Sequence, residues 1–133
     1  MAVRAVRGAT QLEYDERDHL LLRVGELVTV VMRCNELRAD DLVSIVFTAT
    51  DDISSDYPAY AARTIGLVDV PLLCARELEI TDGMPRVVRL MAHVETERSR
   101  DEITHVYLHG AAALRRDLSH VQEVPDDTTT GQT

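Results

Sequence analysis

The sequence predicts an α+β domain in which a mixed sheet of five strands packs against two helices. Three observations support this fold class. Two segments carry helix signals, about five short apolar segments resemble strands, and 133 residues suffice for one hydrophobic core but not for two. Two helices can cover only one face of such a sheet. The other face would remain apolar, and a closed ring of like subunits is the natural way to bury it.

The first half of the chain contains the clearest predicted helix. Residues 2–7 predict a first strand, which Gly8 would end. Residues 15–34 predict the helix, with Asp15 as a plausible N-cap. A buried strand is expected over residues 42–50. The helix carries an apolar stripe at i, i+4, i+7 and i+11, made by Leu20, Val24, Leu27 and Val31.

The second half alternates strands with short helical pieces. Pro58 suits the first turn of a helix over residues 58–65, which Gly66 would end. From His120 the chain is poor in apolar residues, so we expect a domain over 1–119 and a mobile tail over 120–133. Strands are expected over 68–73, 86–94, 103–109 and, as one more short piece, 111–114, with a single helical turn over 74–78.

The charge balance narrows the possible partners. The net charge is −9, from 23 acidic and 14 basic residues, and every basic residue is an arginine. Nucleic acids and anionic membranes require a basic footprint, so neither is an expected partner. Any anion site in this chain must be built from guanidinium groups, which bind carboxylates through two parallel hydrogen bonds.

The sequence predicts no metal and no cofactor. It contains no phosphate-binding loop, dinucleotide fingerprint or Cys/His zinc pattern. His105 and His109 are expected on one strand, too far apart to hold a single ion. Cys34 and Cys74 are the only cysteines, and the chain starts without a secretory signal or a long apolar run, so we expect reduced thiols and a cytoplasmic location.

Three arginines are candidates for an anion site. Arg7 ends the first predicted strand, Arg63 lies on the short helix with Ala59, and Arg89 shares a strand face with apolar residues. An arginine in such a position is more often half of an ion pair, and the excess of acidic over basic residues strengthens that alternative. The residue pattern alone leaves both interpretations open.

Several blocks of the sequence, in order and at matching spacing, resemble the AroH family of chorismate mutases from Ala2 to about Leu118. The blocks are Arg4-Ala-Val-Arg-Gly-Ala-Thr10, Thr48-Ala-Thr50, Tyr57-Pro-Ala59 with Arg63, Val70-Pro71 with Cys74 and Glu77, Gly83 with Arg86-Val-Val-Arg89, His105-Val-Tyr-Leu108, and Leu114-Arg115 before Asp117-Leu118.

The resemblance implies an enzyme that rearranges chorismate to prephenate in phenylalanine and tyrosine biosynthesis, without cofactor or metal. It also implies a pseudo-barrel homotrimer with active sites between subunits. One subunit would contribute Arg7, Cys74, Glu77, Arg89 and Tyr107 to each site. The neighbouring subunit would contribute Tyr57, Ala59 and Arg63. Leu114 and Arg115 would lie near the same cleft.

Roles follow from the same resemblance. Arg89 would face the ether oxygen of the substrate, and Arg7 and Arg63 would bind its carboxylates. Glu77 and Cys74 would act on the hydroxyl and the allyl side, although a salt bridge from Glu77 to Arg76 or Arg86 is the alternative.

The sequence departs from the family pattern at Tyr57, where Phe is familiar, at Tyr60, where Lys can occur, and in a stretch between Arg63 and Cys74 that is one residue shorter. The runner-up function is a non-catalytic trimeric sensor of an aromatic-pathway dicarboxylate. A trimeric imine deaminase is a third interpretation that no motif favours.

Overall fold

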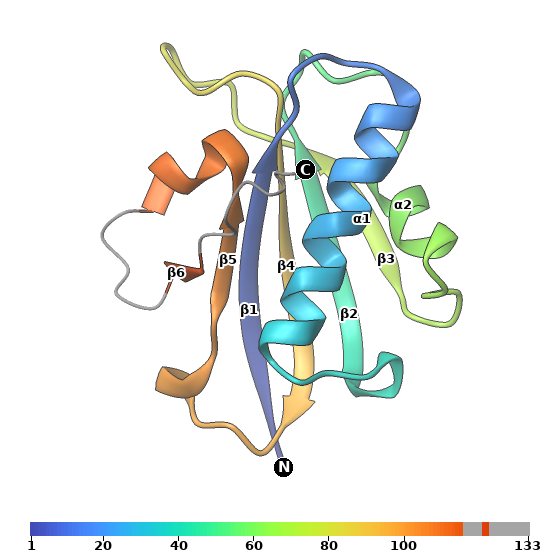
Figure 1. Cartoon of the computed structure of the whole chain (residues 1–133), viewed down its shortest axis with the longest axis vertical. Coiled ribbons are helices and arrows are strands. Elements are labelled where there is room, and N and C mark those ends of the chain that lie inside the picture. The colour runs from blue at the N-terminus through green and yellow to red at the C-terminus, as the bar shows by residue number, and fades with distance from the viewer. Residues whose placement is uncertain (116–120, 123–133) are drawn as a thin grey trace.

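The computed structural model describes residues 1–115 and 121–122, and its centre is one mixed sheet (Figure 1). The strand order is β3-β2-β4-β1-β5-β6. Only β4 among the described strands runs antiparallel to its neighbours, because β1 pairs with β5, β2 with β3, and β5 with β6 in parallel. The strands are β1 (Ala2–Gln11), β2 (Leu42–Ala49), β3 (Leu72–Arg76), β4 (Val87–Thr96), β5 (His105–Leu108) and β6 (Val121–Gln122).

Both helices cover the same face of the sheet, as Figure 1 shows. They are α1 (Arg17–Cys34) and α2 (Pro58–Thr64). The apolar stripe of α1 packs on sheet residues such as Phe47, which is fully buried. Gly8 permits this close packing, since a Cβ there would lie 3.2 Å from Leu27 Cδ1. The helices and this face of the sheet therefore form the main core.

The opposite face of the sheet is open and partly apolar. Val3 is 58% exposed, Val43 43%, Leu73 62% and Met91 38%. Side chains on a strand alternate between faces, so these residues lie across the sheet from the core. The predicted α+β class is confirmed, with the two-residue strand β6 added to the five strands expected, and the two helices leave one partly apolar face uncovered.

Two predicted elements are wrong in type. Residues 74–78 do not form a helical turn, because β3 runs through Cys74 to Arg76 and starts later than the strand predicted over 68–73. Parallel pairing with β2 overrides the helix propensity of this segment. Residues 111–114 are not a strand but part of a 3-10 helix, η3 (His109–Arg115), which begins where His109 takes a left-handed φ of 55°.

Other boundaries also differ from the predictions. Glu16, not Asp15, caps α1, by accepting hydrogen bonds from the backbone of Asp18 and His19. The first strand continues beyond Gly8, because the Gly8 backbone pairs with both β4 and β5. The predicted tail lies largely outside the described residues, except for Val121–Gln122, which form β6.

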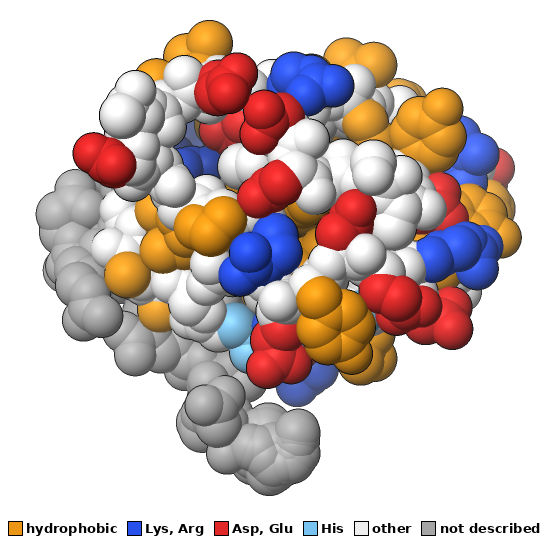
Figure 2. Space-filling model, turned by 90° about the horizontal axis from the view of Figure 1, so that it is seen from above, with side chains coloured by type: hydrophobic (Ala, Val, Ile, Leu, Met, Phe, Trp, Pro, Cys, Tyr) orange, Lys and Arg blue, Asp and Glu red, His pale blue; other side chains and the backbone are white. Residues whose placement is uncertain are grey.

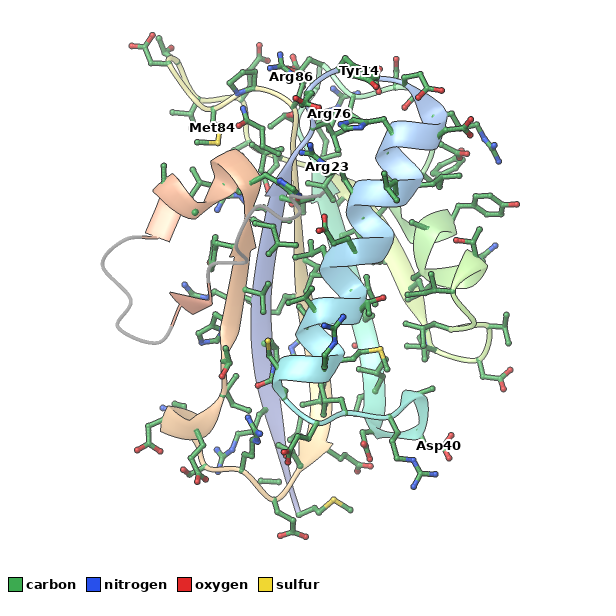
Figure 3. The ribbon with its side chains drawn as sticks, in the orientation of Figure 1. Tyr14, Arg23, Asp40, Arg76, Met84 and Arg86 are labelled. Carbon is green, nitrogen blue, oxygen red and sulfur yellow. The ribbon has the colours of Figure 1, made fainter. Side chains whose placement is uncertain are left out.

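Arginine side chains link several elements at the upper end of the molecule, where Figure 3 shows Arg23, Arg76 and Arg86. Arg23 donates to the carbonyl of Gln11 at 2.7 Å, and Arg86 Nε donates to the carbonyl of Leu12 at 3.0 Å. These bonds hold the end of β1 to α1 and to the start of β4. Seen from this end, acidic and arginine side chains are interspersed with hydrophobic groups (Figure 2).

No helix in the described part of the chain combines the length and the apolar character needed to cross a membrane.

His19 makes folding stability depend on pH. It is 9% exposed, stacks on Tyr14 at 4.5 Å, and its Nε2 accepts a hydrogen bond from the Glu13 backbone. Burial, with help from the charge of Arg23, lowers the pKa of His19 below its ordinary 6.5. The unfolded chain therefore binds a proton more readily, so this contribution to stability is full above pH 6.5 and is lost as pH falls towards the folded pKa.

We expect the free energy of unfolding of the wild type to fall as the pH is lowered below about 6.5, and that of His19→Gln to fall less over the same range. Denaturant titrations at several pH values measure this difference. Equal slopes for the two proteins would contradict the assignment to His19.

Candidate active site

A cavity of about 310 Å³ lies on the open face of the sheet, at its centre. Four of the residues predicted for the site line it: Arg7, Glu77, Arg89 and Tyr107. They come from four different strands or strand ends, so the sheet itself assembles this group. The remaining lining residues are Gly8, Val46, Thr48, Leu90 and Met91.

Strand register explains how distant residues meet in the cavity. Thr48 of β2 lies opposite Arg89 of β4, Arg89 opposite Ala9 of β1, and Ala9 beside Tyr107 of β5. This row crosses four strands on one face. Ala9 is small and fully buried, and it separates Arg89 from Tyr107. The neighbouring row brings Arg7 opposite Met91.

Arg89 and Glu77 form an ion pair in the cavity. Arg89 Nε lies 3.3 Å from Glu77 Oε2, and their side chains are 42% and 20% exposed. The same Glu77 oxygen accepts a hydrogen bond from the Thr48 hydroxyl. Arg89 Nε is buried and makes no hydrogen bond of good geometry within the described residues, so the pair is electrostatic. Glu77 thus orients the guanidinium, whose other nitrogens remain accessible at the cavity.

Arg7 and Tyr107 flank this ion pair. Arg7 has an exposed side chain, while its backbone N–H donates to His105 Nδ1 at 2.9 Å. Tyr107 is only 2% exposed and belongs to a small cluster with Ala9, Val87 and Ala111. The cavity therefore contains two permanent cations, one carboxylate and one buried phenol, a combination suited to binding a small dianion.

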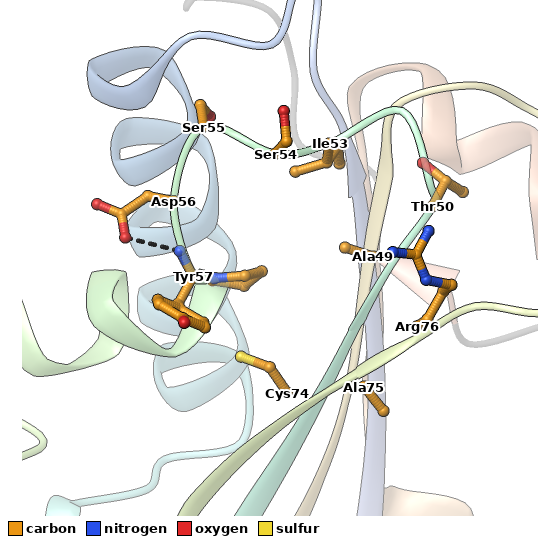
Figure 4. A pocket seen from close by; sticks show the side chains of 11 residues that line it. Ala49, Thr50, Ile53, Ser54, Ser55, Asp56, Tyr57, Cys74, Ala75 and Arg76 are labelled. Atoms are coloured by element: carbon orange, nitrogen blue, oxygen red, sulfur yellow. Dashed lines mark hydrogen bonds between the residues drawn. The ribbon is translucent and has the colours of Figure 1, made fainter.

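The predicted residues Cys74 and Tyr57 line a second cavity, of about 520 Å³ (Figure 4). In that view the Cys74 sulfur points towards Tyr57, whereas Arg76 projects towards Ala49 and Thr50. The backbone N–H of Ala59 donates to Cys74 Sγ at 3.4 Å. Tyr57 is 72% exposed and Ala59 is buried at 9%. The start of α2 (Tyr57 and Ala59), together with Cys74, therefore forms a second group of predicted site residues, which we call the α2 end.

The loop before α2 is held by acidic residues. Asp15 accepts hydrogen bonds from the backbones of Ser54 at 2.9 Å and Ser55 at 3.2 Å. Burial tends to raise the pKa of Asp15, but the hydrogen bonds from Ser55 and Ser54 outweigh it and the pKa lies below 3.8. Asp56 pairs with Arg17 Nε at 2.8 Å. These contacts fix Tyr57 at the start of α2.

The sequence predicted Cys74 and Glu77 within a single helical turn, but the chain is extended there and the two side chains lie on opposite sides of the sheet. Cys74 opposes Phe47 and packs on the helix side of the sheet, whereas Ala75 opposes Thr48 on the open side. The Glu77 N–H donates to the Ala49 carbonyl at 2.9 Å, which continues the extended chain and places Glu77 on the open side. The predicted alternative partners of Glu77, Arg76 and Arg86, are also wrong, because the partner is Arg89.

Besides Cys74, Tyr57 and Ala59, three further predicted residues lie outside the first cavity. Arg63 is exposed on α2, one turn from the buried Ala59. Leu114 packs against the small cluster around Tyr107, beside the cavity. Arg115 ends η3, and its side chain is not among those described.

Comparison with known proteins assigns the family. Residues 3–118 match the family described as chorismate mutase type I. The chain belongs to the type I chorismate mutases. The chorismate mutase AroH of Thermus thermophilus is 39% identical over 121 residues, which cover 90% of this chain and 99% of that protein.

Two further relatives agree with this assignment. The chorismate mutase AroH of Bacillus subtilis (strain 168) is 35% identical over 120 residues, covering 90% of this chain and 94% of that protein. A solved chorismate mutase from Clostridium thermocellum superimposes with a TM-score of 0.81 at 35% identity, covering 82% of this chain and 97% of that chain. The chain is thus an enzyme of the isomerase class.

Sequence reasoning missed Thr48 and Met91 as site residues of this chorismate mutase. Thr48 appeared only as part of a matching block, and Met91 only among the unnamed apolar residues that share a strand face with Arg89. The register that places Thr48 opposite Arg89 could not be derived from the sequence alone, because β2 and β4 are far apart in the chain. The alternation within β4, which puts Arg89 and Met91 on one face, was the available signal.

Thr48→Val tests whether the hydroxyl of Thr48 holds Glu77 in place. The substitution keeps the shape but removes a hydrogen bond to a charged acceptor, so we expect chorismate turnover to fall by about tenfold or more. Thr29→Val, at an exposed position of α1, is the matched control and should keep native turnover. Native turnover in Thr48→Val would show that Glu77 needs no such support.

Proposed function

We propose that the chain catalyses the rearrangement of chorismate to prephenate, in a site whose two halves come from different subunits of a homotrimer. One half is the cavity with Arg7, Glu77, Arg89 and Tyr107, and the other is the α2 end. The observation that carries the proposal is that two guanidinium groups, one oriented by Glu77 and one exposed, line one small cavity on the open face of the sheet.

The chemistry matches what these residues offer. The rearrangement breaks a C–O ether bond while a C–C bond forms within one molecule, and no proton moves in the chemical step. A catalyst must hold the compact conformer and stabilise the charge that separates in the transition state. The cavity needs no general base, nucleophile, cofactor or metal for this purpose.

Arg89 is the residue we assign to the ether oxygen. Negative charge grows on that oxygen as the bond breaks, and a guanidinium already aimed at it needs no reorganisation. Its ion pair with Glu77 keeps the guanidinium oriented at the cavity. We assign to Glu77 the further role of accepting a hydrogen bond from the substrate hydroxyl.

The two carboxylates of chorismate require two further cations. Arg7, beside Tyr107, would bind one of them within the same subunit. Arg63 is exposed on α2, so it would reach the second carboxylate across the interface with a neighbour. We place Cys74 with Tyr57 and Ala59 in this second half, because its sulfur lies on their side of the sheet.

The uncovered apolar face supports the trimer. Val3, Val43, Leu73 and Met91 would be removed from water if sheets of neighbouring subunits met there. The same assembly would bring the α2 end of one subunit towards the central cavity of the next. We further propose that the enzyme acts in the cytoplasm, with residues 1–119 as its folded domain.

The alternative of a non-catalytic sensor has no support from the comparisons. Both curated relatives are named as chorismate mutases. A sensor would need cations for the carboxylates, but it would have no use for a third cation facing the ether oxygen.

Subunit mixing tests the function and the assembly together. Arg7→Ala and Arg63→Ala should each be nearly inactive, since each removes a carboxylate-binding cation. When they are mixed under conditions that exchange subunits, about a quarter of the sites in a cyclic trimer should regain both arginines. Loss of the ultraviolet absorbance of chorismate measures the recovery.

The control is each variant alone, taken through the same exchange procedure. A site built within one chain would give no recovery, because every chain carries a lesion. A fully active monomer would contradict the shared site directly, and an inactive wild type would contradict the function.

A further inference from the structure

His109 links the end of β5 to helix α1. It begins η3, the orange coil that follows β5 in Figure 1. Side chains alternate along a strand, so an extended chain would place His109 on the open face with Tyr107. His109 instead adopts a left-handed φ of 55°, and its ring lies on the helix side, where Nε2 is 2.8 Å from Glu26 Oε1 of α1. Since a carboxylate can only accept a hydrogen bond, the ring donates this one.

The left-handed conformation of His109 has to be held by its surroundings. It is unfavourable for a residue with a Cβ and persists where neighbouring contacts fix it. The hydrogen bond to Glu26 is one such contact, between side chains that are 23% and 32% exposed. Gly110 makes another, because a Cβ there would collide with Gln11 Oε1. Gln11 Nε2 in turn donates to the Pro85 carbonyl at 3.0 Å. These contacts fix the path by which the chain enters η3.

The position of η3 bears on the first cavity through Tyr107. Ala111 of η3 belongs to the small buried cluster of Tyr107, and Leu114 packs against that cluster. Tyr107 is 2% exposed and lines the cavity beside Arg7. Because the ring is closely packed against η3, a shift of η3 moves the ring as well. The anchoring of η3 therefore decides where the phenol lies relative to Arg7.

We propose that His109 and Glu26 are positioning residues of the active site. Their hydrogen bond holds η3 against Tyr107 and keeps the phenol beside Arg7. Neither residue is among those that line the cavity. The inference rests on the proposed function, in which Arg7 and Tyr107 bind a carboxylate of chorismate. That carboxylate is charged in the ground state and in the transition state alike, so loss of the hydrogen bond weakens substrate binding and leaves the chemical step unchanged.

Glu26→Ala and His109→Asn test the pair kinetically. Asn tolerates a left-handed φ but is too short to reach Glu26, so His109→Asn keeps the backbone and removes the hydrogen bond. We expect each variant to raise the KM for chorismate about fivefold, with kcat within about twofold of the wild type. Glu26→Gln keeps an acceptor oxygen and should have a native KM. Asp18→Ala, which removes the same charge from an exposed side chain of α1, is the matched control.

A double-mutant cycle tests whether the effect runs through Tyr107. Tyr107→Phe keeps the packed ring and removes the hydroxyl. In that background Glu26→Ala should raise the KM by less than about twofold further, because the group that it positions is already gone. A further increase as large as in the wild-type background would show that the pair acts elsewhere, and would overturn the inference.

NMR of ring-labelled tyrosine gives a readout that does not depend on activity, measured well below the unfolding temperature of each variant. The Tyr107 signal, identified by its loss in Tyr107→Phe, should shift in Glu26→Ala and His109→Asn but not in Glu26→Gln or Asp18→Ala. An unmoved signal in both of the first two variants would contradict the inference, and so would a fall in kcat at constant KM. An inactive wild type whose Tyr107 signal still responds would contradict the proposed function but leave the positioning of Tyr107 standing.

Discussion

The register of β4 between β1 and β2 is the constraint on which both the core and the site depend. Alternate residues of this strand point to opposite faces, so Val88, Leu90, Ala92 and Val94 enter the core while Val87, Arg89, Met91 and His93 face the open side. A slip of one residue would bury Arg89 against α1 and expose the apolar set. Hydrophobic burial on one face thus fixes the position of a cation on the other.

The same register sets the positions of the charged side chains on the open face. Arg89 is held by Glu77, whereas Arg7, beside it, has no carboxylate among the described salt bridges. The paired arginine is fixed in orientation, and the unpaired one is available to an incoming anion. One cavity thus holds a cation of fixed orientation and a cation that can bind an anion. This combination suits a reaction that depends on substrate binding and charge stabilisation and needs no acid–base chemistry.

The amphipathic helix α1 and the central strands could be predicted, because their apolar periodicity is strong and local. Two short segments could not. Residues 74–78 contain good helix formers, but Cys74 to Arg76 pair with β2. Residues 111–114 follow a left-handed His109 that turns the chain out of the sheet. The site residues were found through the family resemblance, but their division between two cavities depends on which side of β3 Cys74 occupies, a tertiary feature.

The central claim is that Arg89 stabilises the transition state as an aimed guanidinium rather than as a general positive charge. The turnover numbers of Arg89→Lys and Arg89→Ala, compared with wild type in samples of matched thermal stability, test it most directly. We predict that kcat falls by about 10²–10³ in Arg89→Ala and that Arg89→Lys, which keeps the charge but loses the planar fork, recovers little of it. Near-native kcat in either variant would contradict the account.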